Sequence, residues 1–230
     1  MILSHKHKFI FLKTKKTAGT SIEVALSSLC GDEDVVTPLV ETDERLRAGG
    51  RGAQNWRQHG WWQSPRPFWK RRILKVAPQD YGFYNHMTTG EAKALINDDR
   101  VWRSYFKFAF ERNPWDREVS YYHYCYRDAD TRPSFDRFIE TDRRARLNNY
   151  EIYSIGGDVA VDFVGRYETL EDDLKRALSH VGLTATPSLP RAKGDIRKEQ
   201  RSYREYYTPD TQRLIGEWYR PEIALLGYEF

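Results

Sequence analysis

Residues 13–21 bring together side-chain types that bind anions. The segment reads Lys-Thr-Lys-Lys-Thr-Ala-Gly-Thr-Ser. Lysines supply mobile positive charge, hydroxyls donate hydrogen bonds, and glycine lets the backbone approach a ligand closely. The segment is therefore a candidate anion site, with contributions expected from Lys15, Lys16, Thr17, Gly19, Thr20 and Ser21.

The flanking sequence predicts a strand before this segment and a helix after it. Phe9–Leu12 is an apolar run of aromatic and branched residues, typical of a strand covered on both faces. Four apolar residues then recur at helical spacing, namely Ile22, Ala25, Leu26 and Leu29. A helix N-terminus presents N–H groups without intrahelical partners and the positive end of the helix dipole. The junction is a candidate phosphate site, and a solvated polar turn is the plain alternative.

The segment does not have the order of a Walker A loop. That motif places its lysine after the second glycine, whereas Lys16 precedes Gly19. The order Lys-Thr-Ala-Gly-Thr-Ser over 16–21 instead resembles the 5′-phosphosulfate loop of sulfotransferases. The resemblance implies that the donor is 3′-phosphoadenosine 5′-phosphosulfate (PAPS), with Lys16 acting in both binding and catalysis. The implied donor contacts are Lys16, Thr17, Ala18, Gly19, Thr20 and Ser21.

A second predicted junction between a strand and a helix also carries a cation. Tyr105–Phe110 predicts a strand, Asn113 is a suitable N-cap, and Pro114 is a suitable first helical residue. Arg112 at the strand end can hold a phosphate through two parallel hydrogen bonds. Ser120, about two turns into the helix, can add a hydroxyl.

This second segment carries the most specific resemblance in the chain. Residues 110–122 read Phe-Glu-Arg-Asn-Pro-Trp-Asp-Arg-Glu-Val-Ser-Tyr-Tyr. They closely resemble the sulfotransferase 3′-phosphate element, which implies that Arg112 and Ser120 hold the 3′-phosphate of PAPS. Glu111 departs from the aliphatic or small residue common in relatives. It could pair with Arg112 and weaken phosphate binding, or point to the opposite face of the strand, which we expect.

His86 is the candidate general base. It lies just before a predicted helix that begins with Thr88 and Glu91 at capping-box spacing. Connections of this kind gather at the ligand-binding edge of an open α/β sheet. The unperturbed pKa of histidine suits taking a proton from a hydroxyl near neutral pH. The alternative is a structural histidine that is hydrogen-bonded to the backbone.

The C-terminal half predicts a short helix at 134–140, a hairpin, and helices after Thr169 and Thr208. The two hairpin strands are expected at Tyr150–Ile155 and Val159–Val164. Residues 162–171, Asp-Phe-Val-Gly-Arg-Tyr-Glu-Thr-Leu-Glu, resemble sulfotransferases of the carbohydrate type. The Tyr-x-x-Tyr-Tyr-Thr phrase at 203–208 and the Leu-Gly-Tyr at 226–228 resemble the same group.

Six cations form a basic run at 191–204 around Gly194. Such a run is commonly a solvated face. Sulfotransferases, however, commonly close a basic loop over the 3′-phosphate at this chain position. This resemblance makes Arg201 the expected contact from the run.

Residues 45–72 alternate basic and aromatic side chains, with glycine and proline but no acidic residue. We predict a long irregular insertion. The tryptophans could pin the loop to the core. Alternatively, the mixture suits nucleic-acid strands or anionic sugars, and as a ligand-facing segment we favour an acceptor-binding flap.

Composition describes a mildly basic protein of one domain. The 230 residues carry a net charge of +4 and only two cysteines, Cys30 and Cys125, which lack metal-ligand spacing. No apolar run approaches the roughly 20 residues that span a bilayer, and we expect a cytoplasmic protein that needs no metal. Oligomeric state cannot be read from the sequence.

The resemblance, which covers nearly the whole chain, implies an α/β fold. The expected architecture is P-loop-NTPase-like, with three layers and a central, mainly parallel sheet flanked by helices. The implied reaction moves a sulfonate group from PAPS to an acceptor hydroxyl, on a carbohydrate, and leaves adenosine 3′,5′-bisphosphate (PAP). Three alternatives stay open at this point: a nucleotide kinase, a non-enzymatic nucleic-acid-binding protein, and a sulfotransferase fold that binds nucleotide without turnover.

Overall fold

The computed structural model describes residues 1–47, 50–57, 82–142, 146–185, 187–190 and 201–230. Its centre is a five-stranded sheet with the order β3-β1-β2-β4-β7. The strands are β1 (Ile2–Ser4), β2 (Phe9–Leu12), β3 (Val35–Val36), β4 (Phe106–Glu111) and β7 (Phe163–Arg166). A separate hairpin pairs β5 (Ser154–Ile155) with β6 (Asp158–Val159).

Four of the five strands point the same way. β2 pairs in parallel with β4, and β4 pairs in parallel with β7. Only β1 runs in the opposite direction, because it is antiparallel to both β2 and β3. The predicted mainly parallel sheet is therefore confirmed, with one antiparallel strand inserted near its edge.

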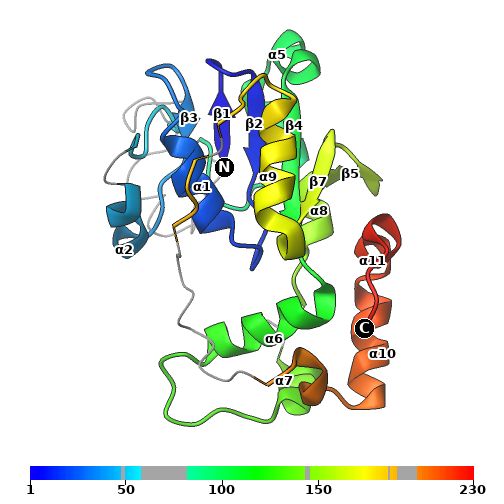
Figure 1. Cartoon of the computed structure of the whole chain (residues 1–230). Coiled ribbons are helices and arrows are strands. Elements are labelled where there is room, and N and C mark those ends of the chain that lie inside the picture. The colour runs from blue at the N-terminus through cyan, green and yellow to red at the C-terminus, as the bar shows by residue number, and fades with distance from the viewer. Residues whose placement is uncertain (48–49, 58–81, 143–145, 186, 191–200) are drawn as a thin grey trace, which may run out of the picture.

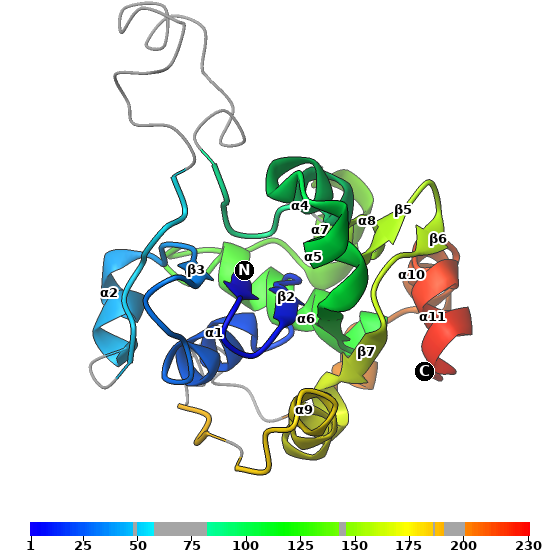
Figure 2. The same ribbon diagram turned by 90° about the horizontal axis from the view of Figure 1, so that it is seen from above.

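Helices cover both faces of the sheet, which gives the expected three layers (Figures 1 and 2). One face packs against α1 (Gly19–Ser27) and α9 (Leu170–Ser179). The other face packs against α4 (Thr89–Ile96), α5 (Asp99–Ser104) and α8 (Asn149–Tyr153). After β3 the chain forms α2 (Glu41–Glu44), which leads directly into a 3₁₀ turn at Arg45–Arg47.

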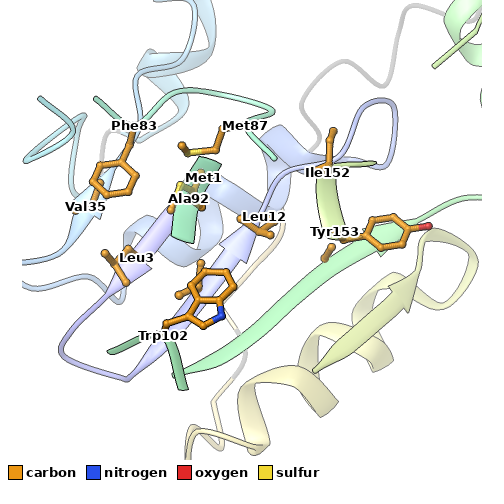
Figure 3. Close-up of a cluster of buried hydrophobic side chains, with 12 residues drawn as sticks. Met1, Leu3, Leu12, Val35, Phe83, Met87, Ala92, Trp102, Ile152 and Tyr153 are labelled. Carbon is orange, nitrogen blue, oxygen red and sulfur yellow. The ribbon is translucent and has the colours of Figure 1, made fainter. Parts of the chain in front are cut away.

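Alternation along the central strands sends side chains into two separate cores. Phe9 and Phe11 of β2 pack with α1 and α9, whereas Ile10 and Leu12 pack with α4, α5 and α8. Figure 3 shows the second of these cores, where Leu12 and Trp102 lie together. Both faces of β2 are thus covered, as its continuous apolar sequence predicts.

A third cluster lies beyond the carboxyl ends of the strands. It joins α6 (Pro114–Cys125), α7 (Phe135–Thr141), α10 (Pro209–Trp218) and α11 (Arg220–Leu226), with 3₁₀ turns at Tyr167–Thr169 and Tyr203–Tyr206 nearby. Tyr122 and Phe138 are central members, with ring centroids 5.4 Å apart. The capping box expected at Thr88 and the N-cap expected at Asn113 are both formed.

The structure corrects three sequence predictions. Tyr150–Ile155 is not a strand over its length, because 149–153 form α8 and only Ser154–Ile155 joins the hairpin. The second hairpin strand predicted at Val159–Val164 is also wrong, because β6 ends at Val159 and β7 begins at Phe163 in the central sheet, and β1 was not predicted. Most of the insertion predicted at 45–72 lies outside the described residues, so the interpretation of its aromatic and basic side chains stays a prediction.

Among the described residues, the structure has no helix with the length and apolar character required to traverse a bilayer.

Close packing between β4 and β7 predicts a sharp cost for a single methyl group. A Cβ added at Gly165 would lie 2.5 Å from the ring of Phe110, which is fully buried. We expect Gly165→Ala to lower the free energy of unfolding by about 1–3 kcal/mol. Gly90→Ala is the matched control, because nothing lies within 4 Å of its added Cβ. Urea denaturation measures both, and equal stability of the two variants would contradict this packing.

Candidate functional site

Two junctions between strands and helices meet at one edge of the sheet. β2 and β4 are parallel neighbours in which Leu12 pairs with Ala109, so the segments that follow them emerge side by side. There they enclose a cavity of about 310 Å³. Its walls are formed by Lys13, Thr14, Lys15, Lys16, Ala18, Gly19, Thr20, His86, Arg112, Ser120, Tyr121, Tyr124 and Tyr167.

The first loop turns tightly before α1. Lys16 and Ala18 have φ angles of 63° and 59°, in the left-handed region that most residues avoid. Gly19 is required by close approach, because an added Cβ would lie 2.7 Å from Cγ of Lys13. Gly19 and Thr20 thus place the first turn of α1, with its N–H groups that lack intrahelical acceptors, against the cavity.

Buried hydrogen bonds and a buried ion pair fix the position of this loop. The hydroxyl of Thr14 donates to the carbonyl of Phe110 on β4 and lies 2.7 Å from the hydroxyl of Thr17. Nζ of Lys13 lies 2.7 Å from Oε2 of Glu23, and both side chains are buried. The first lysine of the segment is therefore paired within the protein, which balances much of its charge.

Arg112 is oriented by three neighbours. Its Nε and Nη2 atoms both donate to Oδ2 of Asp116, at 2.8 and 2.5 Å. Its guanidinium lies over the ring of Tyr167, 4.1 Å from the centroid, and Nη1 lies 3.5 Å from the carbonyl oxygen of Lys16. These contacts hold Arg112 between the two junctions.

Glu111 does not pair with the guanidinium of Arg112. Its Oε1 lies 2.5 Å from Nη1 of Arg117, and both side chains are fully buried. The same oxygen accepts the backbone N–H of Arg112 at 2.9 Å. Glu111, which departs from the common sequence pattern, therefore supports the backbone of Arg112. The side chain of Arg112 is left to line the cavity.

His86 enters the cavity from a third segment. Phe83 and Met87 on either side of it are buried in the core shown in Figure 3 and anchor the connection over the sheet edge. Nδ1 of His86 lies 2.9 Å from the carbonyl oxygen of Lys13. Burial, together with the positive charge of Lys13, lowers the pKa of His86 to about 4. The ring is therefore neutral at pH 7.

Most of the sequence-predicted residues meet in this cavity. Lys16, Ala18, Gly19, Thr20, His86, Arg112 and Ser120 line it. Three others do not: Thr17 in the loop and Ser21 in the first turn of α1 are buried, and exposed Arg201 places its guanidinium 3.7 Å from the ring centroid of Tyr206. The remaining predicted basic-run residues from 191 to 200 lie outside the described residues.

Three tyrosines in the wall were not predicted as site residues. Tyr121 and Tyr124 follow Ser120 on α6, and Nζ of Lys16 lies 4.5 Å from the ring centroid of Tyr124. Tyr121 belongs to the Ser-Tyr-Tyr phrase and could have been included on that ground. Asp116 could also have been found, because it lies in the first turn of the predicted helix, four residues after Arg112. Within the described part of the chain, no group of three or more metal-ligating side chains is present.

Together, the layered α/β fold and a cationic cavity at the N-terminus of α1 form a site whose charge suits an anionic ligand. The profile of the Sulfotransferase family matches residues 1–229. The chain therefore belongs to the sulfotransferase family, whose members transfer sulfonate groups.

Two further comparisons describe what the chain resembles. An uncharacterized protein of Archaeoglobus fulgidus is 35% identical over 88 residues, which cover 36% of this chain and 73% of that protein. The crystal structure of mouse sulfotransferase SULT7A1 complexed with PAP matches with a TM-score of 0.45 and 15% identity, over 96% of this chain and 86% of that chain.

Glu118 belongs to a buried cluster of acidic residues next to the site, and its raised pKa makes the free energy of unfolding depend on pH. Glu118 is fully buried, and its Oε1 accepts the hydroxyl of Tyr219 at 2.5 Å. Burial outweighs the attraction of Arg117 and raises the pKa of Glu118 to about 8, and nearby Glu111 and Glu222 add to the increase. Between its ordinary value of 4.5 and about 8, the folded chain holds a proton that the unfolded chain releases. The free energy of unfolding contributed by this group therefore falls as pH rises through that window.

We expect Glu118→Gln to flatten the loss of stability between about pH 5 and about pH 8, because glutamine keeps the tyrosine contact and cannot ionise. Thermal unfolding at a series of pH values measures the slope. Exposed Glu217, on α10, supplies the control variant Glu217→Gln. An unchanged slope in Glu118→Gln would show that Glu118 does not hold the extra proton.

Proposed function

We propose that this protein transfers a sulfonate group from PAPS to a carbohydrate hydroxyl, within a single domain. The observation that carries the proposal is convergence: the Lys16 loop, Arg112 with Ser120, and His86 come from three separate segments and line one cavity. Nothing in the local sequence requires these segments to meet. The family supports sulfonate transfer in general, and the cavity supplies a matching set of side chains.

Two groups of residues suit the two phosphates of the donor. In the proposal, Lys16 and the amides at the start of α1 neutralise the 5′-phosphate as it leaves. Arg112 and Ser120 hold the 3′-phosphate, which distinguishes PAPS from ATP. The residues present fit such a ligand, because Arg112 is oriented by Asp116 and faces the cavity together with Lys16.

His86 has the hydrogen-bonding pattern of a general base. A carbonyl oxygen can only accept, so Nδ1 of His86 carries the proton that faces the carbonyl of Lys13. Nε2 then has a lone pair available for the acceptor hydroxyl. The low pKa keeps this lone pair unprotonated at neutral pH.

In the proposed reaction one bond to sulfur forms while another breaks. The acceptor oxygen forms a bond to sulfur while the bond from sulfur to the 5′-phosphate oxygen breaks, and PAP leaves with that electron pair. The hydroxyl proton passes to Nε2 of His86. The protein contributes alignment of the two oxygens and positive charge on the leaving side.

Four features support a carbohydrate acceptor. Residues 162–171 and the two phrases at 203–208 and 226–228 resemble carbohydrate sulfotransferases. Tyr121, Tyr124 and Tyr167 add aromatic surface to the cavity, and such rings pack against the faces of sugars as well as of bases. Screening labelled PAPS against polysaccharides and small alcohols tests the acceptor class directly.

We expect Arg112→Gln to weaken PAP binding by roughly ten- to a hundredfold, since a hydrogen bond to a charged group is lost. Isothermal titration measures the change. Arg103→Gln is the control, because Arg103 is exposed on α5, which precedes β4 and so lies at the opposite end of that strand. Tighter binding of ATP with magnesium than of PAP by the unaltered protein would favour a kinase and contradict the proposal.

We expect His86→Gln to lower kcat by about 10²- to 10⁴-fold while PAP affinity stays unchanged, because only proton transfer is lost. In the unaltered protein, kcat/KM should stay level down to about pH 5 and fall near the pKa of about 4. His7→Gln is the control, since His7 contacts the carbonyl of Leu29 away from the cavity. A normal turnover rate in His86→Gln would remove His86 from the mechanism.

A further inference from the structure

Asn149 grips the backbone of the first loop through both ends of its side-chain amide. Oδ1 accepts the N–H of Lys15 at 2.9 Å, and Nδ2 donates to the carbonyl of Lys15 at 2.9 Å. Asn149 is fully buried as the first residue of α8. The side chain thus binds the peptide groups on both sides of Lys15 as a neighbouring strand would, directly before the left-handed Lys16.

The same amide reaches the second junction. Nδ2 of Asn149 also donates to Oε1 of Glu111 at 3.2 Å, and that oxygen accepts the backbone N–H of Arg112 at 2.9 Å. A continuous path of hydrogen bonds therefore runs from Lys15 through Asn149 and Glu111 to Arg112. It joins the backbones of the two segments that supply the cations of the cavity.

The central carboxylate of this path is held rigidly. Arg117 approaches Oε1 of Glu111 to 2.5 Å, and the hydroxyl of Tyr153 lies 3.4 Å from Oε2. All of these side chains are buried, so water does not compete for the hydrogen bonds. Glu111 is therefore a fixed point against which Asn149 can set the position of the loop.

We propose that Asn149 is a positioning residue that sets the spacing between the two halves of the nucleotide site. This inference rests on the proposed function. A ligand with two phosphates gains affinity only if both halves are already placed for simultaneous contact. A ligand with one phosphate can be bound by the loop alone, whatever the position of Arg112. The bridge through Asn149 thus contributes to selection of a 3′,5′-bisphosphate over a monophosphate.

The test compares the affinities for PAP and for adenosine 5′-monophosphate. In Asn149→Asp an acceptor replaces the Nδ2 donor opposite two acceptors, the carbonyl of Lys15 and the carboxylate of Glu111. We expect the preference for PAP to fall about tenfold, as one or two hydrogen bonds are lost. Asn149→Leu, which is neutral, should show the same fall, and this separates positioning from added charge.

Asn148→Asp is the matched control. Asn148 is the adjacent residue, is exposed, and makes no side-chain cap hydrogen bond. It should retain the full preference for PAP. A general loss of stability would lower the affinities for both nucleotides alike and leave the ratio of the two affinities unchanged. An unchanged ratio in both Asn149 variants would therefore overturn the inference. If the unaltered protein shows no preference for PAP, the proposed function fails and this inference fails with it.

A measurement on the unaltered protein covers the case in which the Asn149 variants do not fold. The N–H of Lys15 should exchange slowly with solvent in the absence of nucleotide, because it is donated to a buried oxygen. Exchange as fast as that of the N–H of Gly157, an exposed residue at the hairpin turn, would show that Asn149 does not hold the loop and would overturn the inference.

Discussion

Parallel pairing between β2 and β4 is the constraint on which the site depends. Each strand is followed immediately by a loop and a helix, so parallel neighbours deliver two helix N-termini to one edge of the sheet. An antiparallel pairing of the same strands would place these junctions at opposite edges. The charged loops could then not share a ligand, whatever their sequences.

Ion pairs, two of them fully buried, determine which charged side chains support the site and which face the cavity. A charge removed from water must be paired. Glu23 pairs with Lys13, Glu111 pairs with Arg117, and Asp116 pairs with Arg112 and orients it. Glu111 shows that an added acid need not oppose anion binding. Its charge is directed to Arg117 and its oxygen to a backbone N–H, so it stabilises the segment that presents Arg112.

Local sequence patterns predicted the two junctions well, because a strand, a cap and a helix each leave a signal within a few residues. Asn113 before Pro114 marked the start of α6 correctly. The failures came where distant contacts decide. Residues 149–153 are rich in residues that suit strands, yet they form α8, whose first residue Asn149 is held by Lys15. The contribution of Asn149 has no local signal at all, since its partners lie 134 and 38 residues away.

The environment of His86 reconciles burial with the need for a base. Burial and the charge of Lys13 favour the neutral ring, so a lone pair is present before any ligand arrives. A group with so low a pKa is a weak base, and by itself it would gain little from proton transfer. An anionic donor in the cavity would reverse part of this effect, because an opposite charge nearby favours the imidazolium. In the proposed reaction the ligand that supplies the sulfonate group would therefore also strengthen the base that completes its transfer.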